Sequence, residues 1–152
     1  MSFRIHAISV DTLTGVRDSG RDVSDHPVSL VSAGGGEPLR CCLRDAIEGE
    51  ELILFGYEPA LPASPYREIG PVFAHAGACP SAPADGYPAA WRGRKQILRA
   101  YDKRGWIHPS TRVHDGSDPE AEIAAILADP EVEQIHSRNV AYGCFMFAIT
   151  RD

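Results

Sequence analysis

Three polar residues near the C-terminal end, His136, Arg138 and Asn139, have the types and spacing expected of an anion site. In an extended strand, residues two apart point to the same face, so His136 and Arg138 would lie side by side. A guanidinium can form two parallel hydrogen bonds to a carboxylate or phosphate, and an imidazole can exchange a proton near neutral pH. We therefore interpret His136 as a candidate catalytic acid or base, and Arg138 and Asn139 as candidate ligand-binding residues. The alternative is a solvated polar face of an edge strand, with Asn139 serving the following turn.

Three more arginines, Arg40, Arg67 and Arg99, are candidate ligand-binding residues because each lies among apolar residues, where a guanidinium needs a partner. Tyr101 would share a strand face with Arg99 and is a further candidate. If these residues converge with His75, the second candidate catalytic histidine, the site would be electropositive within an acidic protein and would attract anions. The alternative for each arginine is an ordinary ion pair with a nearby carboxylate.

The four cysteines, Cys41, Cys42, Cys79 and Cys144, do not show the spacing of a metal site. There is no C-x-x-C motif and no paired Cys/His spacing, so we expect no closed zinc site, no metal and no cofactor. Cys41 and Cys42 are adjacent and would point to opposite faces of an extended backbone. Cysteine catalysis would require a thiol close to a histidine, such as Cys42 or Cys144 beside His136. The alternative is that each cysteine is a small buried apolar residue.

Composition and charge limit the classes of partner. The chain has 152 residues, which suffices for a single domain spanning residues 1–152 with its own core. The formal net charge of -6 and the lack of a basic run argue against nucleic-acid binding. No apolar stretch approaches the roughly 20 residues that cross a bilayer, and the first residues lack the apolar block of a secretory signal. We therefore expect a cytoplasmic protein with reduced thiols and no membrane partner.

Strands would position most of these side chains. Residues 50–57 carry apolar side chains on both faces, which indicates a strand in the interior of a sheet. A loop with three prolines follows, and residues 71–76 return as a second strand with Phe73 and His75 on one face. Arg67 lies at the end of that loop, where two rigid strands would hold it.

The remaining pattern predicts the fold class. Five further segments favour strands, namely residues 3–10, 95–102, 106–114, 131–138 and 144–150. Residues 12–17 could form a short helical turn, and residues 80–90 an irregular surface loop. Helical features mark residues 117–129, where Ser117 or Asp118 can cap, Pro119 suits the first turn, and apolar residues recur at i, i+3 and i+4. We expect an α+β fold, a mostly antiparallel β-sheet with one main C-terminal helix at about 118–129 packed on it.

Several segments, taken in order, resemble the DUF1203 family, bacterial domains of unknown function. The matching segments are Arg40, L-x-D-A-x-x-G-E at residues 43–50, P-Y-R at 65–67, G-P-x-F at 70–73, L-R-A-Y-D at 98–102 and I-H-x-x-N-x-x-x-G-C at 135–144. The resemblance covers the chain from about residue 40 to residue 151. It implies a shared fold and a shared set of polar residues, without a reaction. Relatives often carry a second histidine where this chain has Arg138, so the resemblance does not support a two-histidine or metal mechanism.

Two functions from different classes remain open on the sequence. One is a site for a small anionic metabolite, formed by the arginines and histidines above, with or without catalysis by a histidine as acid or base. The other is a non-enzymatic homodimeric interaction module that would use the apolar strand at residues 144–150 or the proline loop. They differ in whether the side chains of residues 67, 75, 99, 136 and 138 face one cavity.

Overall fold

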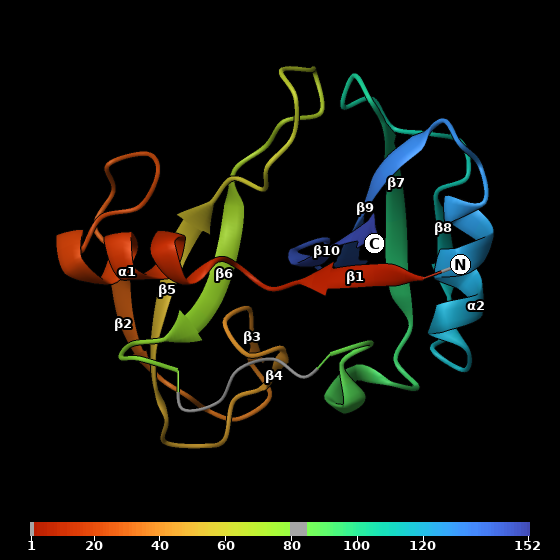
Figure 1. Ribbon diagram of the computed structural model, residues 1–152. Coiled ribbons are helices and arrows are strands. Elements are labelled where there is room, and N and C mark those ends of the chain that lie inside the picture. Colours follow the sequence, from red (N-terminus) through yellow and green to blue (C-terminus); the bar gives the residue numbers. More distant parts are fainter. Residues whose placement is uncertain (1, 80–84) are drawn as a thin grey trace.

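The computed structural model describes residues 2–79 and 85–152 and contains two five-stranded sheets (Figure 1). The strand order of the C-terminal sheet is β1 (Phe3–His6), β10 (Phe145–Arg151), β9 (Val132–Asn139), β7 (Gln96–Asp102) and β8 (Arg112–His114). The strand order of the middle sheet is β2 (Ser29–Ser32), β5 (Glu51–Tyr57), β6 (Gly70–His75), β3 (Pro38–Leu39) and β4 (Arg44–Asp45). Among the described residues, the strands pair antiparallel except β3 and β6, which run parallel.

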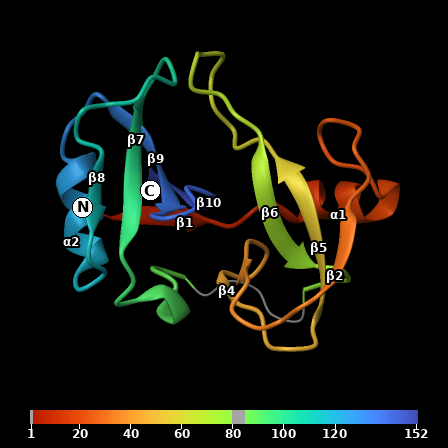
Figure 2. The same ribbon diagram turned by 180° about the vertical axis from the view of Figure 1, so that it is seen from behind.

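The prediction of a mostly antiparallel α+β fold is confirmed in outline, but the expected single sheet and single main helix are corrected. The two sheets stand side by side. After β1 the chain crosses to the middle sheet, where α1 (Val10–Ser19) lies over β2 and β5 (Figures 1 and 2). The predicted C-terminal helix is present as α2 (Pro119–Leu127), which packs on β9. A short 3₁₀ helix, η1, spans Ala89–Trp91. None of the helices in the described residues is long and apolar enough to cross a membrane.

The first helix contains the helical turn predicted at residues 12–17 and is longer at both ends. The strand expected at residues 3–10 ends at His6, and α1 begins at Val10 because Ser9 caps it, with the Ser9 side chain accepting a hydrogen bond from the Thr12 N–H. Gly20 ends the helix in the left-handed conformation, at φ 67°. The predicted strand at residues 3–10 therefore overlaps the helix only at Val10, and Leu13 packs in the core of the middle sheet.

Most predicted strands are present with small shifts of their ends, and one is much shorter. The predicted strand at residues 106–114 retains only β8, because Pro109 cannot donate to a ladder and residues 108–111 form a hydrogen-bonded turn. Residues 28–31, which carried no assignment, contribute to β2. The part of the predicted surface loop at residues 80–84 lies outside the described residues.

Each sheet has its own core, and the two cores meet at the start of β10. Leu52, Ile53 and Phe55 of β5 are buried in the first core, which confirms the prediction of an interior strand. The second core packs α2, through side chains such as Ile123, against the C-terminal sheet. Phe145 of β10 belongs to the first core although its strand lies in the other sheet. The junction between the sheets is therefore a packed surface, and a cavity borders it.

Candidate functional site

Arg40 lies at the junction of the two sheets and is 2% exposed. Its backbone N–H donates to the Phe73 carbonyl of β6, so the end of β3 holds it in place. Its Nε donates to the Phe145 carbonyl of β10 at 2.7 Å, and its Nη1 donates to the Pro38 carbonyl at 2.6 Å. The other terminal nitrogen, Nη2, makes no hydrogen bond to the residues that the structure describes.

The Arg40 guanidinium is a buried cation, and no acidic side chain in the described part of the chain pairs with it. None of the ion pairs formed within residues 2–79 and 85–152 includes it. Burial lowers the pKa of Arg40 to about 10, and the nearby Cys144 thiol opposes that shift. The side chain therefore keeps its charge at neutral pH, in an environment where an unpaired charge costs several kcal/mol.

A cavity of about 480 Å³ adjoins Arg40. Its walls are mainly apolar and come from both sheets, with Leu54, Pro71 and Phe73 on the middle sheet and the β9–β10 turn opposite. That turn contributes Asn139, one of the candidate ligand-binding residues, together with Tyr142 and Cys144. Glu37 also lines the cavity, but its carboxylate accepts the backbone N–H groups of Gly34 and Gly35, so the loop already engages its charge.

The other predicted arginines pair with glutamates, and Arg138 and Glu68 also line a further hollow of about 220 Å³. Arg138 Nη2 lies 2.5 Å from Glu68 Oε1, and Arg99 Nη1 lies 3.3 Å from the same oxygen. Arg138 Nε also donates to the Gly143 carbonyl at 2.7 Å. Arg67 pairs with Glu58. These contacts are the ordinary ion pairs of the alternative interpretation, and a ligand in that hollow would compete with Glu68 for Arg138.

His136 and Tyr101 lie beside this arginine group in a hollow of only about 10 Å³, which also borders Arg67 and Arg138. The ring centroids of His136 and Tyr101 are 4.7 Å apart, and His136 Nε2 lies 3.0 Å from Gln134 Oε1. His136 is 2% exposed, so the alternative of a solvated polar strand face does not describe it. Burial, followed by repulsion from Arg138 and Arg99, lowers the pKa of His136 to about 3. The imidazole is therefore neutral at pH 7 and a weak base.

His75 lines none of the hollows that border the other predicted site residues. At the end of β6, its Nε2 lies 2.7 Å from Glu50 Oε2, and its Nδ1 lies 3.4 Å from Cys41 Sγ. Arg44 holds Glu50 through two hydrogen bonds of 2.9 and 3.0 Å. Sequence reasoning did not indicate Glu50 and Arg44 as neighbours of His75. The predicted site residues thus divide among the Arg40 cavity, the arginine–glutamate group and the His75 neighbourhood.

Spacing along the chain did not indicate the residues around His75. The cluster holds three cysteines besides the histidine, and the ligand atoms of Cys41, Cys42, His75 and Cys79 all lie within 4.8 Å of one another. Cys41 and Cys42 belong to the turn after β3. His75 is the last residue of β6 and Cys79 follows that strand, so tertiary structure brings the two pairs together. The His-x-x-x-Cys spacing of the second pair is the one signal that could have suggested a metal site.

The apolar strand proposed as a dimer surface lies inside the molecule. β10 is flanked by β1 and β9, and Met146, Phe147 and Ile149 are buried. These side chains could reach a second chain only if the strand left its sheet. The strand therefore offers no exposed apolar surface for association.

The comparisons with known proteins identify a family and nothing closer. The family model described as "Protein of unknown function (DUF1203)" matches residues 36–151. No curated protein and no solved structure matches the chain. The matched region contains Arg40, Asn139 and Cys144 of the cavity as well as the cysteine and histidine cluster. Because the match covers most of the chain, the protein belongs to the DUF1203 family.

Proposed function

We propose that the protein binds a small organic anion, a carboxylate with an apolar body, in the cavity between the two sheets. The carboxylate pairs with Arg40, and the apolar body contacts the walls formed by Leu54, Pro71 and Phe73. The observation that carries this proposal is the buried arginine with no acidic partner among the described residues, placed beside a cavity of about 480 Å³.

The charge of the site favours an anion. Two of the three guanidinium nitrogens of Arg40 bind backbone carbonyls, which hold the group in position but do not neutralise it. A carboxylate beside Nη2 would replace the lost solvation and form charge-assisted hydrogen bonds. Each such bond contributes about 1.5–3 kcal/mol when the rest of the environment is unchanged.

Shape and polarity favour a monoanion with a hydrocarbon part. The volume of about 480 Å³ lies within the range of small-molecule pockets. A single cationic group balances one negative charge, so a carboxylate fits better than a doubly charged phosphate. Contact between the apolar walls and a hydrocarbon part of the ligand stabilises the complex by roughly 25 cal/mol for each Å² of apolar surface removed from water. The Asn139 amide can hydrogen-bond a further polar group of the ligand.

Binding, without chemistry, is the activity that this geometry supports. His136 lies in the separate hollow near Arg138, and its lowered pKa makes it a poor proton acceptor at pH 7. His75 lines neither hollow. Cys144 lines the cavity with Arg40, and among the described residues no histidine lines it with them.

Matched probes test the proposal. Hexanoate, octanoate and phenylacetate are titrated into the protein by calorimetry, alongside hexanol, octanol and phenylethanol, which keep the apolar body and lack the charge. Acetate and inorganic phosphate serve as head groups alone. We expect each carboxylate to bind roughly 10- to 100-fold more tightly than its alcohol, which corresponds to the contribution of one charged hydrogen-bonded pair.

A cavity-filling variant separates this site from non-specific binding. Leu54→Trp reduces the space while leaving Arg40 intact, and Leu30→Trp adds the same bulk to the neighbouring strand, where Leu30 is exposed. We expect Leu54→Trp to abolish binding of octanoate and Leu30→Trp to leave it unchanged. Equal binding by both variants, or equal affinity for acid and alcohol, would contradict the proposal.

A further inference from the structure

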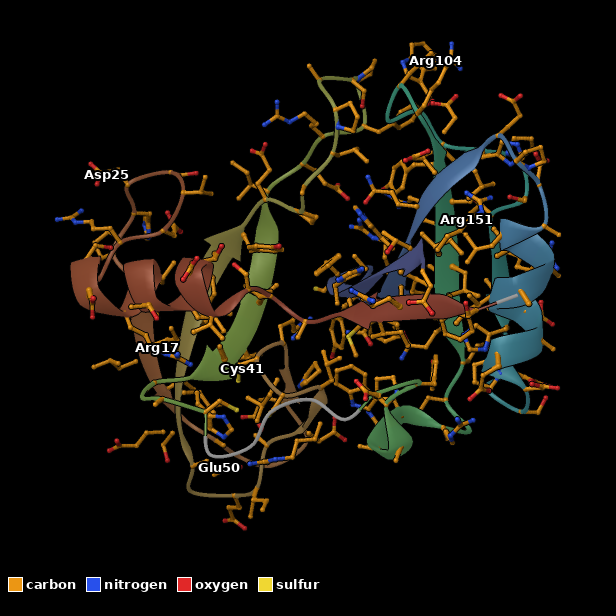
Figure 3. The ribbon with its side chains drawn as sticks, in the orientation of Figure 1. Arg17, Asp25, Cys41, Glu50, Arg104 and Arg151 are labelled. Atoms are coloured by element: carbon orange, nitrogen blue, oxygen red, sulfur yellow. The ribbon has the colours of Figure 1, made fainter. Side chains whose placement is uncertain are left out.

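A cluster of sulfur and imidazole ligands lies at the end of β6, in the middle sheet. Cys41, Cys42 and His75 are buried, and Cys79 is half-buried. Figure 3 shows Cys41 near this end of β6, with Arg17 and Glu50 on the same side of the molecule. No role in the Arg40 cavity requires these groups, since none of them lines it.

The distances within the cluster approach those of a tetrahedral zinc site. Zinc bonds of about 2.3 Å to sulfur and about 2.0–2.1 Å to nitrogen place ligand atoms roughly 3.6–3.8 Å apart. In the structure, Cys41 Sγ lies 3.4 Å from His75 Nδ1 and 4.0 Å from Cys42 Sγ. Cys42 Sγ lies 4.0 Å from the same ring nitrogen. Shifts of a few tenths of an ångström would therefore suffice to bring these atoms around one ion.

The backbone explains why adjacent cysteines converge. Cys41 and Cys42 occupy a turn instead of a strand, and the Leu43 N–H closes it by donating to the Leu39 carbonyl. Leu43 itself has φ 58°, which bends the chain so that it returns as β4. The expectation that the two side chains point to opposite faces applies to extended backbone and does not hold here.

The surroundings of His75 have the second layer that metal-bound histidines usually possess. Nδ1 faces the thiols, and Nε2 lies 2.7 Å from Glu50 Oε2, so the Nε2–H donates to the carboxylate and leaves the Nδ1 lone pair for a metal. Glu50 also accepts the Ile47 N–H at 2.7 Å and two hydrogen bonds from Arg44. The histidine ring is thus oriented, and its tautomer selected, by a carboxylate that is itself held.

We propose that Cys41, Cys42, Cys79 and His75 form a structural zinc site that ties the turn after β3 to the end of β6. Three thiolates and a neutral imidazole are a closed donor set for a tetrahedral divalent ion, and they leave no position for substrate. Binding releases the three thiol protons and gives the site a net charge of minus one. Arg17 of α1 donates two hydrogen bonds to the His75 carbonyl, at 3.1 and 3.0 Å, and so places a cation beside it.

Metal content and cobalt spectroscopy test this site on the whole chain. Purified protein, stripped with chelator under reducing conditions, is titrated with zinc and assayed by elemental analysis. We expect one zinc per chain, and cobalt substitution should give the intense visible bands and thiolate charge-transfer absorption of a tetrahedral sulfur-rich site. A protein that binds less than one zinc per chain after the titration, or a cobalt spectrum without thiolate bands, would overturn the proposal.

Variants assign the ligands. Cys79→Ser removes the half-buried ligand, and Cys144→Ser removes a cysteine of the other cavity. We expect Cys79→Ser to lose tight zinc binding and Cys144→Ser to keep it. Glu50→Gln should weaken zinc by roughly 10-fold or more while one zinc per chain still binds at saturation. Equal zinc affinity in the two serine variants, or a disulfide among the cluster cysteines in freshly purified protein, would contradict the assignment. Wild-type cobalt spectra decide the matter if Cys79→Ser does not fold.

Discussion

Acid should destabilise this protein through His136, and the size of the effect follows from its burial. The pKa of His136 is lowered to about 3 in the folded chain, against an ordinary value of 6.5. Between these values the unfolded chain binds a proton that the folded chain does not, so stability rises with pH and is lost as pH falls below about 6.5. At neutral pH neither state is protonated at this ring, and the contribution vanishes there.

The loss between pH 7 and pH 4 comes to about 3 kcal/mol when both pKa values are used in the linkage relation. Urea unfolding followed by far-UV circular dichroism at pH 7, 6, 5 and 4 measures it. His136→Leu removes the titrating ring from between Tyr101 and Phe145 with little change in volume. Burial also lowers the pKa of His6 and His114, but these groups act equally in both proteins.

The difference between wild type and variant therefore isolates His136. Between pH 7 and pH 4, we expect the free energy of unfolding to fall by about 3 kcal/mol less in His136→Leu than in the wild type. Leu30→Ala, at an exposed residue that does not titrate, serves as the control, and its pH profile should run parallel to that of the wild type. Parallel pH profiles for wild type and His136→Leu would refute the reasoning, because they would mean that His136 is protonated as easily when folded as when unfolded.

Two further predictions concern the scaffold. Gly116 and Gly93 both have positive φ, of 84° and 78°, but a Cβ at Gly116 would meet Arg94 backbone atoms at 2.5 Å, whereas one at Gly93 meets nothing within 4 Å. Urea titration should show that Gly93→Ala lowers the free energy of unfolding by about 1–2 kcal/mol and that Gly116→Ala lowers it by about 3 kcal/mol or more. Equal losses would contradict the close approach of Gly116 to the Arg94 backbone. The two sheets should unfold as one domain, because Arg40 and Phe145 join their cores. Trp91 fluorescence reports the C-terminal sheet, and its midpoint should coincide with that of circular dichroism, whereas separate midpoints would mean independent sheets.

Local patterns predicted the elements whose sequence favours one structure. Apolar side chains on both faces of β5 indicated an interior strand, and Asp118 followed by Pro119 indicated the start of α2. Ser9 at the start of α1 had the same capping chemistry, but it follows apolar residues that also suit a strand. The division into two sheets depends on long-range pairing, such as β1 with β10, which no local pattern encodes.

The candidate site was predictable in its residue types and not in its grouping. Arg40 among apolar residues indicated a buried guanidinium in need of a partner, but its contact with the Phe145 carbonyl depends on how the sheets meet. Polar residues alternating along β9 suggested an edge strand, whereas β9 lies between β10 and β7 and buries His136. The cysteine and histidine cluster was not predictable from spacing along the chain, because a turn supplies one pair of its residues and the end of a strand supplies the other.

The most direct test of the central claim is the arginine side-chain NMR spectrum during a titration with octanoate. Each Arg Nε–H gives its own signal, and Arg40→Lys identifies that of Arg40. Our account predicts that the Arg40 signal shifts and saturates with octanoate, that octanol leaves it in place, and that the signals of Arg99 and Arg138 stay where they are because Glu68 already pairs with them. A stationary Arg40 signal at saturating octanoate would contradict it.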